Sequence, residues 1–324
     1  MDFKEQIDGG IMAEMIKKAT RESFGEALVK IAEENDRVVV LDADLAAATK
    51  TGIFKKAFPE RFFDCGIAES NMIGIAAGLA TCGKIPFAAS FAMFSAGRAF
   101  EQVRNSVAYP HLNVKIAGSH AGISTGEDGA THQCLEDIAL MRTIPGMTVI
   151  NPCDHYEMLG AVKAMAEIDG PCYVRLGRLA VESVNNNDDY KFELGKGVQL
   201  RDGSDVTIIA TGLMVQEAIK ASDSLKEQGI SARVINIHTI KPIDEEIIIK
   251  AAKETGKIVT CEEHNVIGGL GEAVCAVLSE KCPTPVKRIG VYDRFGHSGP
   301  AVDLLKEFGL SAENIEKEVK EFIK

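Results

Sequence analysis

The sequence predicts an α/β protein of two domains, each built around a largely parallel sheet flanked by helices. Short runs rich in Val and Ile alternate with longer helical patterns along almost the whole chain. The short runs are continuously apolar, as expected of parallel strands that are covered on both faces. One polar stretch at 184–190 (VNNNDDY) interrupts the alternation and is the best linker candidate. We therefore expect domains at residues 1–185 and 190–324.

The order of the elements supports this fold class. The expected strands are 37–42, 113–117, 148–151, 172–176, 206–211, 232–237, 257–261 and 286–291, with a further strand ending near Asp64. The expected helices are 11–34, 70–81, 96–107, 155–168, 215–228, 245–255 and 272–281. A strand followed by a helix, repeated along the chain, indicates parallel strands joined by right-handed crossovers.

Composition and charge exclude several classes of function. The chain holds 36 basic and 47 acidic residues, a net charge of −11, which disfavours binding to a nucleic-acid backbone. No apolar run approaches the ~18–20 residues of a membrane span. The start, MDFKEQIDGG, lacks the basic and apolar regions of a signal peptide. We expect a soluble, cytoplasmic protein with no nucleic-acid or membrane partner.

The cysteines agree with a reducing compartment. None of the eight is spaced as C-x-x-C, and no paired Cys/His ligand spacing occurs. Scattered cysteines in a long chain are typical of reduced thiols, mostly buried as small apolar groups. We expect no metal site on this chain.

Common nucleotide-binding and hydrolase motifs are absent. The sequence has no G-x-x-x-x-G-K-[ST], G-x-G-x-x-G, H-E-x-x-H or G-x-S-x-G pattern. The glycine-rich run at 268–271 precedes a helix, and it is either a tight strand-to-helix turn or an anion site at a helix N-terminus. His264, in EEHN just before it, is expected to be structural.

Segment 119–133 (SHAGISTGEDGATHQ) carries the densest group of polar side chains. Fifteen residues are long for a loop in an α/β domain, and long ordered loops are usually functional. His120, Asp128 and His132 lie in it. Two imidazoles and a carboxylate in one loop favour a site that handles protons and hydroxyl groups. The loop itself is indicated by Gly118, Gly122, Gly126 and Gly129.

A second segment, 63–78 (FDCGIAESNMIGIAAG), ends a strand and begins a helix near Glu69. The Glu69 carboxylate either stabilises the helix N-terminus or lies at the carboxyl end of a strand, where open α/β sheets bind ligands. Gly74 and Gly78 fall on one face of the helix, which indicates close packing by another helix or a subunit.

A third segment, 90–97 (SFAMFSAG), places Phe91 and Phe94 three residues apart. The pair is either ordinary core or an apolar wall for a flat heterocycle. The spacing alone leaves both interpretations open.

In this order and spacing, the three segments resemble transketolases, thiamin-diphosphate enzymes of the pentose phosphate pathway that move two-carbon ketol units between sugar phosphates. GEDGATHQ followed by LMRTIPGMTVINPCDHYE resembles the transketolase loop and the strand after it. FFDCGIAESNMIGIAAGLA resembles the segment with the cofactor-activating glutamate. FELGKGVQLRDGSDVTIIATG and EEHNVIGGLGEAV resemble the carboxy-terminal domain of the superfamily. The resemblance covers essentially the whole chain but only half of a full-length transketolase.

The resemblance implies roles for individual residues. Glu69 would bind the aminopyrimidine ring nitrogen of thiamin diphosphate, and Phe91 and Phe94 would flank that ring. His120 and His132 would face the donor hydroxyls and move protons, and one such acid–base group is typically worth ~10²–10⁴ in rate.

Further roles follow from the same resemblance. Asp128 would contact a sugar hydroxyl, and Asp44, in LDADL, would lie near the cofactor and the subunit contact. Arg21 and Arg178 match arginines that hold the terminal phosphate of the sugar, because the guanidinium fork suits phosphate. From the sequence alone, each arginine is equally well read as a surface ion pair.

The resemblance also implies a partner. The chain has no GDG…N motif, which in full-length transketolases binds the metal and the diphosphate. An amino-terminal transketolase subunit with that motif and Mg²⁺ or Ca²⁺ is therefore expected, in a heterotetramer with two copies of each chain. Two departures are Gly97, where the family has a third aromatic residue, and positions 48–49, where it has a serine.

Three alternatives stay open at this point. One is the beta subunit of a 2-oxo-acid dehydrogenase, which shares the IAE segment but should lack GEDG-x-TH. Another is half of a deoxyxylulose-phosphate-synthase-like enzyme. The third is a catalytically silent paralogue that binds a nucleotide or a partner chain. The second domain carries no obvious chemistry and is expected to stabilise the assembly.

Overall fold

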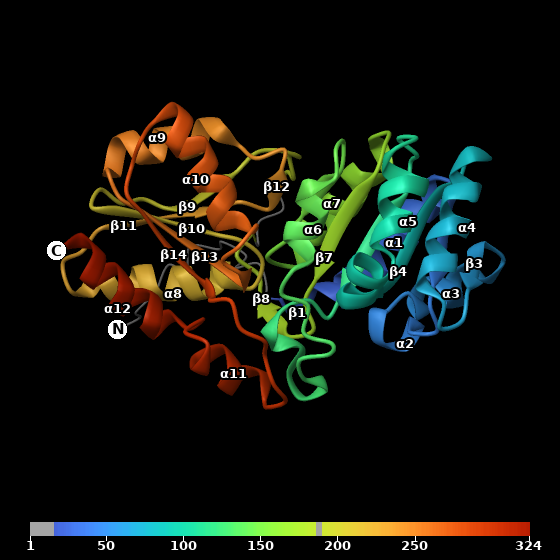
Figure 1. The fold of residues 1–324 in the computed structure, drawn as a ribbon, viewed down its shortest axis with the longest axis horizontal. Helices are drawn as coiled ribbons and strands as arrows, with labels where there is room; N and C mark the ends of the chain where they lie inside the picture. The colour runs from blue at the N-terminus through green and yellow to red at the C-terminus, as the bar shows by residue number, and fades with distance from the viewer. Residues whose placement is uncertain (1–15, 186–189) are drawn as a thin grey trace, which may run out of the picture.

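The computed structural model describes residues 16–185 and 190–324 and holds two large sheets, each flanked by helices (Figure 1). Both sheets are mainly parallel, so the predicted fold class is confirmed. Most of the linker candidate at 184–190 lies outside the described residues, as does the start of the predicted helix 11–34.

The first sheet has seven strands in the order β12-β6-β7-β5-β4-β2-β3. All neighbouring pairs are parallel except β12 with β6. Strand β12 comes from the second half of the sequence and pairs with β6 from the first half, so this sheet contains strands from both halves. The strands are β2 (Val38–Asp42), β3 (Phe62–Asp64), β4 (Ile85–Phe91), β5 (Lys115–Ser119), β6 (Thr148–Ile150), β7 (Cys172–Leu176) and β12 (Thr239–Lys241).

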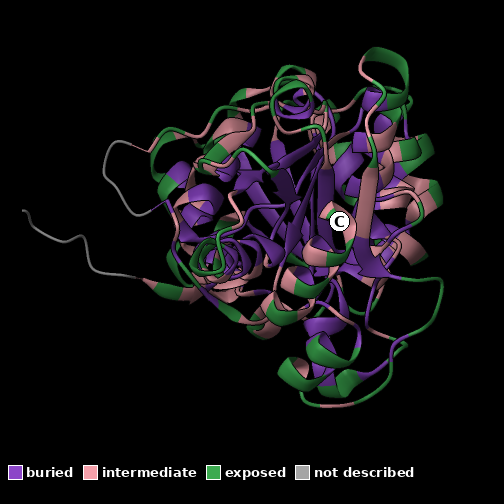
Figure 2. Cartoon of the chain, turned by 90° about the vertical axis from the view of Figure 1, so that its left-hand side faces the viewer, coloured by how far each residue is buried: buried purple, intermediate pink, exposed green. Residues whose placement is uncertain are grey.

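Helices cover both faces of this sheet with separate apolar clusters. On one face lie α1 (Thr20–Glu34), α3 (Gly52–Ala57) and α7 (His155–Glu167). On the other lie α4 (Glu69–Thr81) and α6 (Asp137–Thr143). The strands are therefore buried on both sides, which explains their continuous apolar sequences (Figure 2).

The second sheet has five strands in the order β14-β13-β10-β11-β9, with β9 antiparallel at the edge. One face packs on α8, α11 and α12, and the other on α9 and α10. The strands are β9 (Val198–Arg201), β10 (Val206–Ala210), β11 (Ala232–Asn236), β13 (Ile258–Asn265) and β14 (Val286–Val291). The helices are α8 (Met214–Glu227), α9 (Glu245–Thr255), α10 (Leu270–Lys281), α11 (Ala301–Glu307) and α12 (Ala312–Ile323).

Two predicted helices differ in the structure. Within 11–34, residues Lys17–Ala19 form strand β1, because they pair antiparallel with β8 (Ala180–Glu182). The helix expected at 96–107 is wrong as a continuous α-helix. Two π-helical turns, Met93–Arg98 and Val103–Ala108, flank the short α5 (Phe100–Gln102), and the Ala99 N–H donates to Phe94 five residues back. This wider turn sets where Arg98 lies.

Strand β4 was not predicted, although it lies at the centre of the first sheet. Its sequence, IPFAASF, has a proline at the second position and small residues that do not favour strands. Burial on both faces and pairing with β2 and β5 outweigh these weak local preferences. The strand ends at Phe91 and so delivers the aromatic segment to the edge of the sheet.

Candidate active site

The predicted site residues gather at the carboxyl edge of the first sheet. Glu69 is the first residue of α4 and follows β3, Phe91 ends β4, and His120 directly follows β5. Neighbouring parallel strands present their carboxyl ends at one edge, where open α/β sheets bind ligands. The topology thus brings three separate sequence segments to one place.

Glu69 is almost fully buried, with 2% of its surface exposed. Its Oε2 atom accepts a hydrogen bond from Nη1 of Arg98 at 2.8 Å. The Arg98 guanidinium also lies over the ring of Phe94, 4.5 Å from its centroid. A buried carboxylate needs such a partner. Sequence reasoning missed Arg98, because its position depends on the π-helical turn that carries it.

Four aromatic rings line the neighbouring space. The rings of Phe91 and Phe94 are stacked, with centroids 6.1 Å apart and planes 21° apart. The His120 ring lies 4.1 Å from Phe91, and the His132 ring lies 5.3 Å from Phe94. Arg98 links the buried carboxylate to this group of rings, because it contacts both Glu69 and Phe94.

The glycines of the loop allow its sharp turns. Gly122, Gly126 and Gly129 have φ angles of 88°, 81° and 74°, the left-handed region that favours glycine. Between them lie the 3₁₀ turns of η4 (Ile123–Asp128). Gly118 has a different role, because it lies within β5, where a Cβ atom would come within 2.1 Å of the Tyr173 hydroxyl.

His120 is buried in a strongly positive environment. Only 3% of its surface is exposed, and its Nδ1 atom lies 2.9 Å from the Ser119 hydroxyl. Burial, followed by the charges of Arg21 and Arg178, lowers the pKa of His120 to about 3. The imidazole is therefore neutral near pH 7 and can both donate and accept a hydrogen bond.

The two predicted arginines lie beside this imidazole. Nη1 of Arg21 lies 3.3 Å from Nε2 of His120 and donates to the Ala48 carbonyl at 2.8 Å. Arg178 pairs with Glu127 at 2.8 Å. Burial lowers the pKa of Arg21, and the charge of Arg178 adds to this effect, so the two cations share one region.

The two predicted aspartates stand at the exposed margin. Asp44 has a left-handed backbone with φ of 62°, directly after β2. Asp128 is exposed at the end of η4, in the same loop as the histidines. The structure thus places both near the carboxyl edge without burying either of them.

A third aspartate, Asp42, was not predicted but organises the turn before Asp44. It is fully buried at the end of β2 and accepts hydrogen bonds from the Leu45 N–H, Thr49 and Thr51. Burial raises its pKa to about 6. Thr49 therefore holds the turn in place, at one of the two positions where transketolases would have a serine.

Comparison with known proteins identifies the family. The model for the transketolase pyrimidine-binding domain matches residues 16–183, and the model for the transketolase C-terminal domain matches residues 195–315. The chain belongs to the transketolase family.

Individual transketolase relatives cover the chain to different extents. A putative transketolase C-terminal section of Methanocaldococcus jannaschii is 53% identical over 95% of this chain and 98% of its own length. A solved split gene transketolase, described as an inactive beta4 tetramer, has a TM-score of 0.88 at 53% identity, covering 94% of this chain and 98% of its own. A solved transketolase from Leishmania mexicana has a TM-score of 0.81 at 26% identity and is covered over 46% of its length.

Metal-binding clusters and membrane-spanning helices are both absent from the part of this transketolase chain that the structure describes. No group of three or more His, Cys, Asp or Glu side chains there is arranged to hold a metal ion. No helix among residues 16–185 and 190–324 is both long and apolar enough to cross a membrane.

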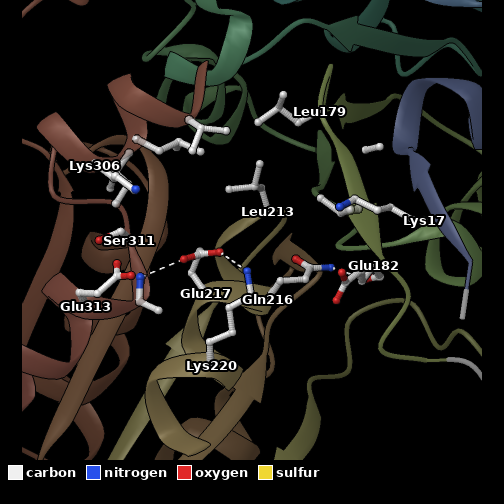
Figure 3. A pocket seen from close by; sticks show the side chains of 16 residues that line it. Lys17, Leu179, Glu182, Leu213, Gln216, Glu217, Lys220, Lys306, Ser311 and Glu313 are labelled. Carbon is white, nitrogen blue, oxygen red and sulfur yellow. Dashed lines mark hydrogen bonds and ion pairs between the residues drawn. The ribbon is translucent and has the colours of Figure 1, made fainter. Parts of the chain in front are cut away.

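A cavity of about 320 Å³ lies apart from the predicted site, where the two domains of the transketolase chain meet (Figure 3). Leu179 and Leu213 form its apolar wall, and Gln216, Glu217 and Lys306 supply polar atoms. Its cations and carboxylates are mixed, and Glu217 is already bonded to Lys220 and to the Ala312 N–H. None of the residues predicted for the site lines this cavity.

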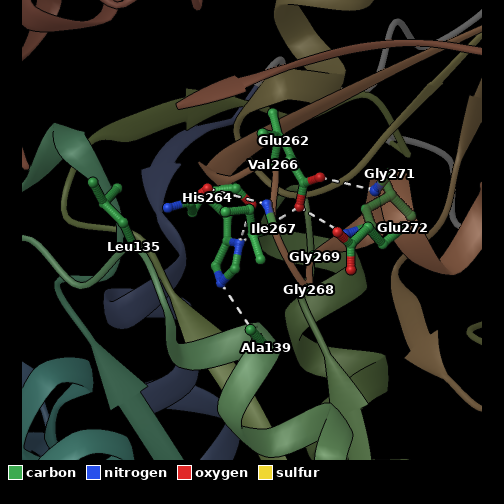
Figure 4. A network of polar contacts seen from close by, with 12 residues as sticks. Leu135, Ala139, Glu262, His264, Val266, Ile267, Gly268, Gly269, Gly271 and Glu272 are labelled. Atoms are coloured by element: carbon green, nitrogen blue, oxygen red, sulfur yellow. Dashed lines mark hydrogen bonds and ion pairs between the residues drawn. The ribbon is translucent and has the colours of Figure 1, made fainter. Parts of the chain in front are cut away.

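The EEHN segment of the transketolase chain lies at the domain junction (Figure 4). The Glu262 carboxylate accepts hydrogen bonds from the N–H groups of Leu270 and Gly271, so the chain itself supplies the anion at the N-terminus of α10. His264 is buried, and its Nε2 atom lies 3.3 Å from the Ala139 nitrogen of α6. Both contacts support structural roles for the glycine-rich turn and for His264.

Proposed function

We propose that this chain is the carboxy-terminal subunit of a two-chain transketolase that transfers a two-carbon ketol unit between ketose and aldose phosphates. The observation that carries the proposal is the meeting of buried Glu69, the Phe91–Phe94 pair and the two loop imidazoles at one sheet edge. Arg21 contacts His120, and the charges of Arg21 and Arg178 both lower the pKa of this imidazole.

The residues fit the pyrimidine end of thiamin diphosphate. A stacked aromatic pair beside a buried carboxylate suits a flat heterocycle with a basic ring nitrogen. When bound, the cofactor supplies the electron sink that ketol transfer requires. Glu69 would hold a proton at the ring nitrogen, and Phe91 and Phe94 would exclude water from that side of the ring.

The imidazoles and Asp128 serve the sugar. Neutral His120 can donate to or accept from a substrate hydroxyl without introducing a charge, since its pKa is about 3. His132, which is partly exposed beside Phe94, can move a proton between the sugar and solvent. Asp128, exposed in the same loop, is suited to accept a hydrogen bond from a sugar hydroxyl and so to select its configuration.

The arginine pair argues for an anionic group at the end of the sugar. The net charge of the chain is −11, yet Arg21 and Arg178 place two cations close enough for one to lower the pKa of the other. A phosphate between two guanidinium groups would relieve this repulsion. A subunit of a 6-deoxy-6-sulfo-D-fructose transketolase of Clostridium sp. (strain MSTE9) is 48% identical, and one of an apulose-4-phosphate transketolase of Phocaeicola vulgatus is 44% identical. A terminal sulfonate is therefore the second candidate for this position.

An amino-terminal partner chain would complete the site. Around Glu69, the apolar side chains of Ile67, Phe63 and Ile75 are exposed, which is typical of a surface that another chain covers. A Cβ atom at Gly74 or Gly78 would meet nothing within 4 Å in the described chain, so this helix face is free for close packing. We propose that the partner carries GDG…N, the Mg²⁺ or Ca²⁺ and the diphosphate, in a heterotetramer, and that Asp44 lies at this contact.

The test is reconstitution. The chain is mixed with an amino-terminal transketolase chain bearing GDG…N, thiamin diphosphate and Mg²⁺, and ketol transfer from xylulose 5-phosphate to ribose 5-phosphate is measured. Transfer by the mixture, and by neither chain alone, is the expected result. A complex that binds the cofactor and exchanges no ketol unit with any phosphorylated or sulfonated donor would show instead a silent binding paralogue.

A further inference from the structure

The second domain reaches directly into the loop that carries the two histidines. Glu263, near the end of β13, has 4% of its surface exposed. Its Oε1 atom accepts a hydrogen bond from the backbone N–H of Ser124 at 2.5 Å. Ser124 belongs to η4, between His120 and His132. A carboxylate of one domain thus holds the backbone of the other domain at the centre of the loop.

The loop is shaped around this carboxylate. Gly122 has a φ of 88°, and a Cβ atom there would lie 2.4 Å from both Cδ and Oε1 of Glu263. Glycine is therefore required twice at this position, for its backbone conformation and for the close approach. Any larger residue at position 122 would therefore displace either Glu263 or the loop.

A buried arginine is the charged neighbour that favours the ionised form of Glu263. Arg175 on β7 is buried, and its Nη2 atom donates to the Glu263 carbonyl at 2.8 Å. The same guanidinium pairs with Asp137 of α6 at 2.8 Å. Burial raises the pKa of Glu263, whereas Arg175 and the Ser124 hydrogen bond favour the charged form. A hydrogen bond to a charged, desolvated acceptor is stronger than a neutral one.

A second anchor holds the other end of the loop. Nε2 of Gln133, next to His132, donates to the His297 carbonyl of the second domain at 2.9 Å and to the Gly126 carbonyl at 3.1 Å. Figure 1 shows the loop, in green, lying against α11 of the second domain, in red. The two anchors, Glu263 and Gln133, therefore bracket η4.

We propose that Glu263 is a positioning residue of the active site, through which the second domain holds the loop of His120, Asp128 and His132 in its working geometry. The proposal rests on the function proposed above for those loop residues. Displacing catalytic groups by about 1 Å can cost on the order of 10²-fold in rate, so a loose loop should affect turnover more than cofactor binding.

The test compares three variants in the two-chain complex. Glu263→Ala removes the acceptor, and Glu263→Gln keeps an acceptor oxygen but loses the charge. Glu262→Gln is the matched control, because it changes the adjacent buried carboxylate, which caps α10 instead of the loop. Hydrogen exchange of the loop amides, thermal stability, thiamin diphosphate affinity, and kcat and KM for xylulose 5-phosphate are measured for each.

In Glu263→Ala, the Ser124 amide should exchange about tenfold faster or more, since that is the range of a hydrogen bond to a charged group. The kcat of the complex that carries Glu263→Ala should fall by about tenfold to 100-fold, with little change in cofactor affinity. Glu263→Gln should recover most of both properties. Glu262→Gln should leave the exchange of the loop as in the wild type.

Three results would overturn the proposal. Unchanged Ser124 exchange and kcat in Glu263→Ala would remove the positioning role. Equal acceleration of the loop in Glu262→Gln would show general destabilisation instead. If Glu263→Ala does not fold, Glu263→Gln is compared with Glu263→Leu, which has no acceptor oxygen. Equal exchange rates of the Ser124 amide in these two variants would likewise contradict the proposal. The exchange measurement needs no turnover, so it remains decisive even if the complex transfers no ketol unit.

Discussion

Single residues in this site owe their chemistry to their surroundings. Glu69 is a carboxylate in an almost dry position, with Arg98 as its partner. His120 is kept neutral by burial and by two neighbouring cations. Both groups could have been ordinary polar residues in another environment. The same burial that costs folding free energy keeps the His120 imidazole neutral, so that it can both donate and accept a hydrogen bond.

Replacing Glu69 tests its role in cofactor activation. In Glu69→Gln, which keeps the size but not the proton affinity of the side chain, turnover should fall by ~10²–10⁴ because one acid–base group is lost. The chain should stay folded and assemble with its partner. Steady-state kinetics of the reconstituted complex provide the measurement, with Glu101→Gln, an exposed carboxylate of α5, as the control. A wild-type rate in Glu69→Gln would exclude the residue from the mechanism.

Arg178 tests how the terminal anion is recognised. Arg178→Ala should lower kcat/KM for a phosphorylated donor by about tenfold or more, the value of one charge-assisted hydrogen bond. The loss for an unphosphorylated donor such as hydroxypyruvate should be small. Arg104→Ala, which removes an exposed arginine whose side chain donates to neighbouring Asn105, is the matched control. Equal losses for both donors would assign Arg178 to the Glu127 ion pair alone.

At the scale of elements, the strands of the first sheet determine where the loop begins. Strand β5 ends at Ser119, and its Gly118 packs against Tyr173 of β7. The Tyr173 hydroxyl in turn donates to Asp137 at 2.8 Å. These contacts fix the end of β5 at Gly118, two residues before His120.

Gly118→Ala tests this close approach. The added Cβ atom would lie 2.1 Å from the Tyr173 hydroxyl, so the overpacked core should lose about 1–3 kcal/mol of stability. The melting temperature should fall by about 1–5 °C, at roughly 1.5 °C per kcal/mol for a chain of 324 residues. Gly74→Ala on α4, where a Cβ atom meets nothing within 4 Å, should leave the isolated chain as stable or slightly more stable. Equal melting temperatures for both variants would contradict the packing described.

Some elements could be predicted from local sequence and others could not. Strands β2 and β10 are short runs rich in Val and Ile, and helix α9 begins and ends where its pattern predicts. Strand β4 and the π-helical turns depend on tertiary packing, which short-range preferences do not report. The same holds for the site. Glu69 and the histidines stand out by residue type and context, whereas Arg98 and Glu263 act through partners 29 and 139 residues away.

At the scale of the whole molecule, the two domains share buried polar contacts as well as apolar surface. Glu157 of α7 is fully buried and accepts hydrogen bonds from Asn236 of β11 at 2.7 Å and from Tyr190 at 3.0 Å. With Arg175 and Glu263, this gives two places where charged groups connect the domains. The second domain is therefore joined to the first by buried polar contacts on both α7 and β7.

The Glu157 contact predicts a dependence of stability on pH. Burial raises its pKa from 4.5 to about 7, so its protonated form is favoured in the folded chain. Protonated Glu157 therefore contributes on the order of 1–3 kcal/mol to the free energy of unfolding. This contribution is present below pH 4.5 and is lost as the pH rises through 7. Relative to Glu157→Gln, the wild type should therefore lose stability between these pH values. Denaturant unfolding of both proteins at several pH values gives the difference, and a constant difference would contradict the prediction.

The proposed function requires one chain to hold the heterocyclic end of the cofactor while another holds its charged end. The most direct measurement is a structure of the two-chain complex with thiamin diphosphate and Mg²⁺. We predict the aminopyrimidine against Phe91 and Phe94, its ring nitrogen within hydrogen-bond distance of Glu69, and the metal bound only by the partner. An aminopyrimidine bound away from Glu69, or a cofactor held entirely by one chain, would contradict the account.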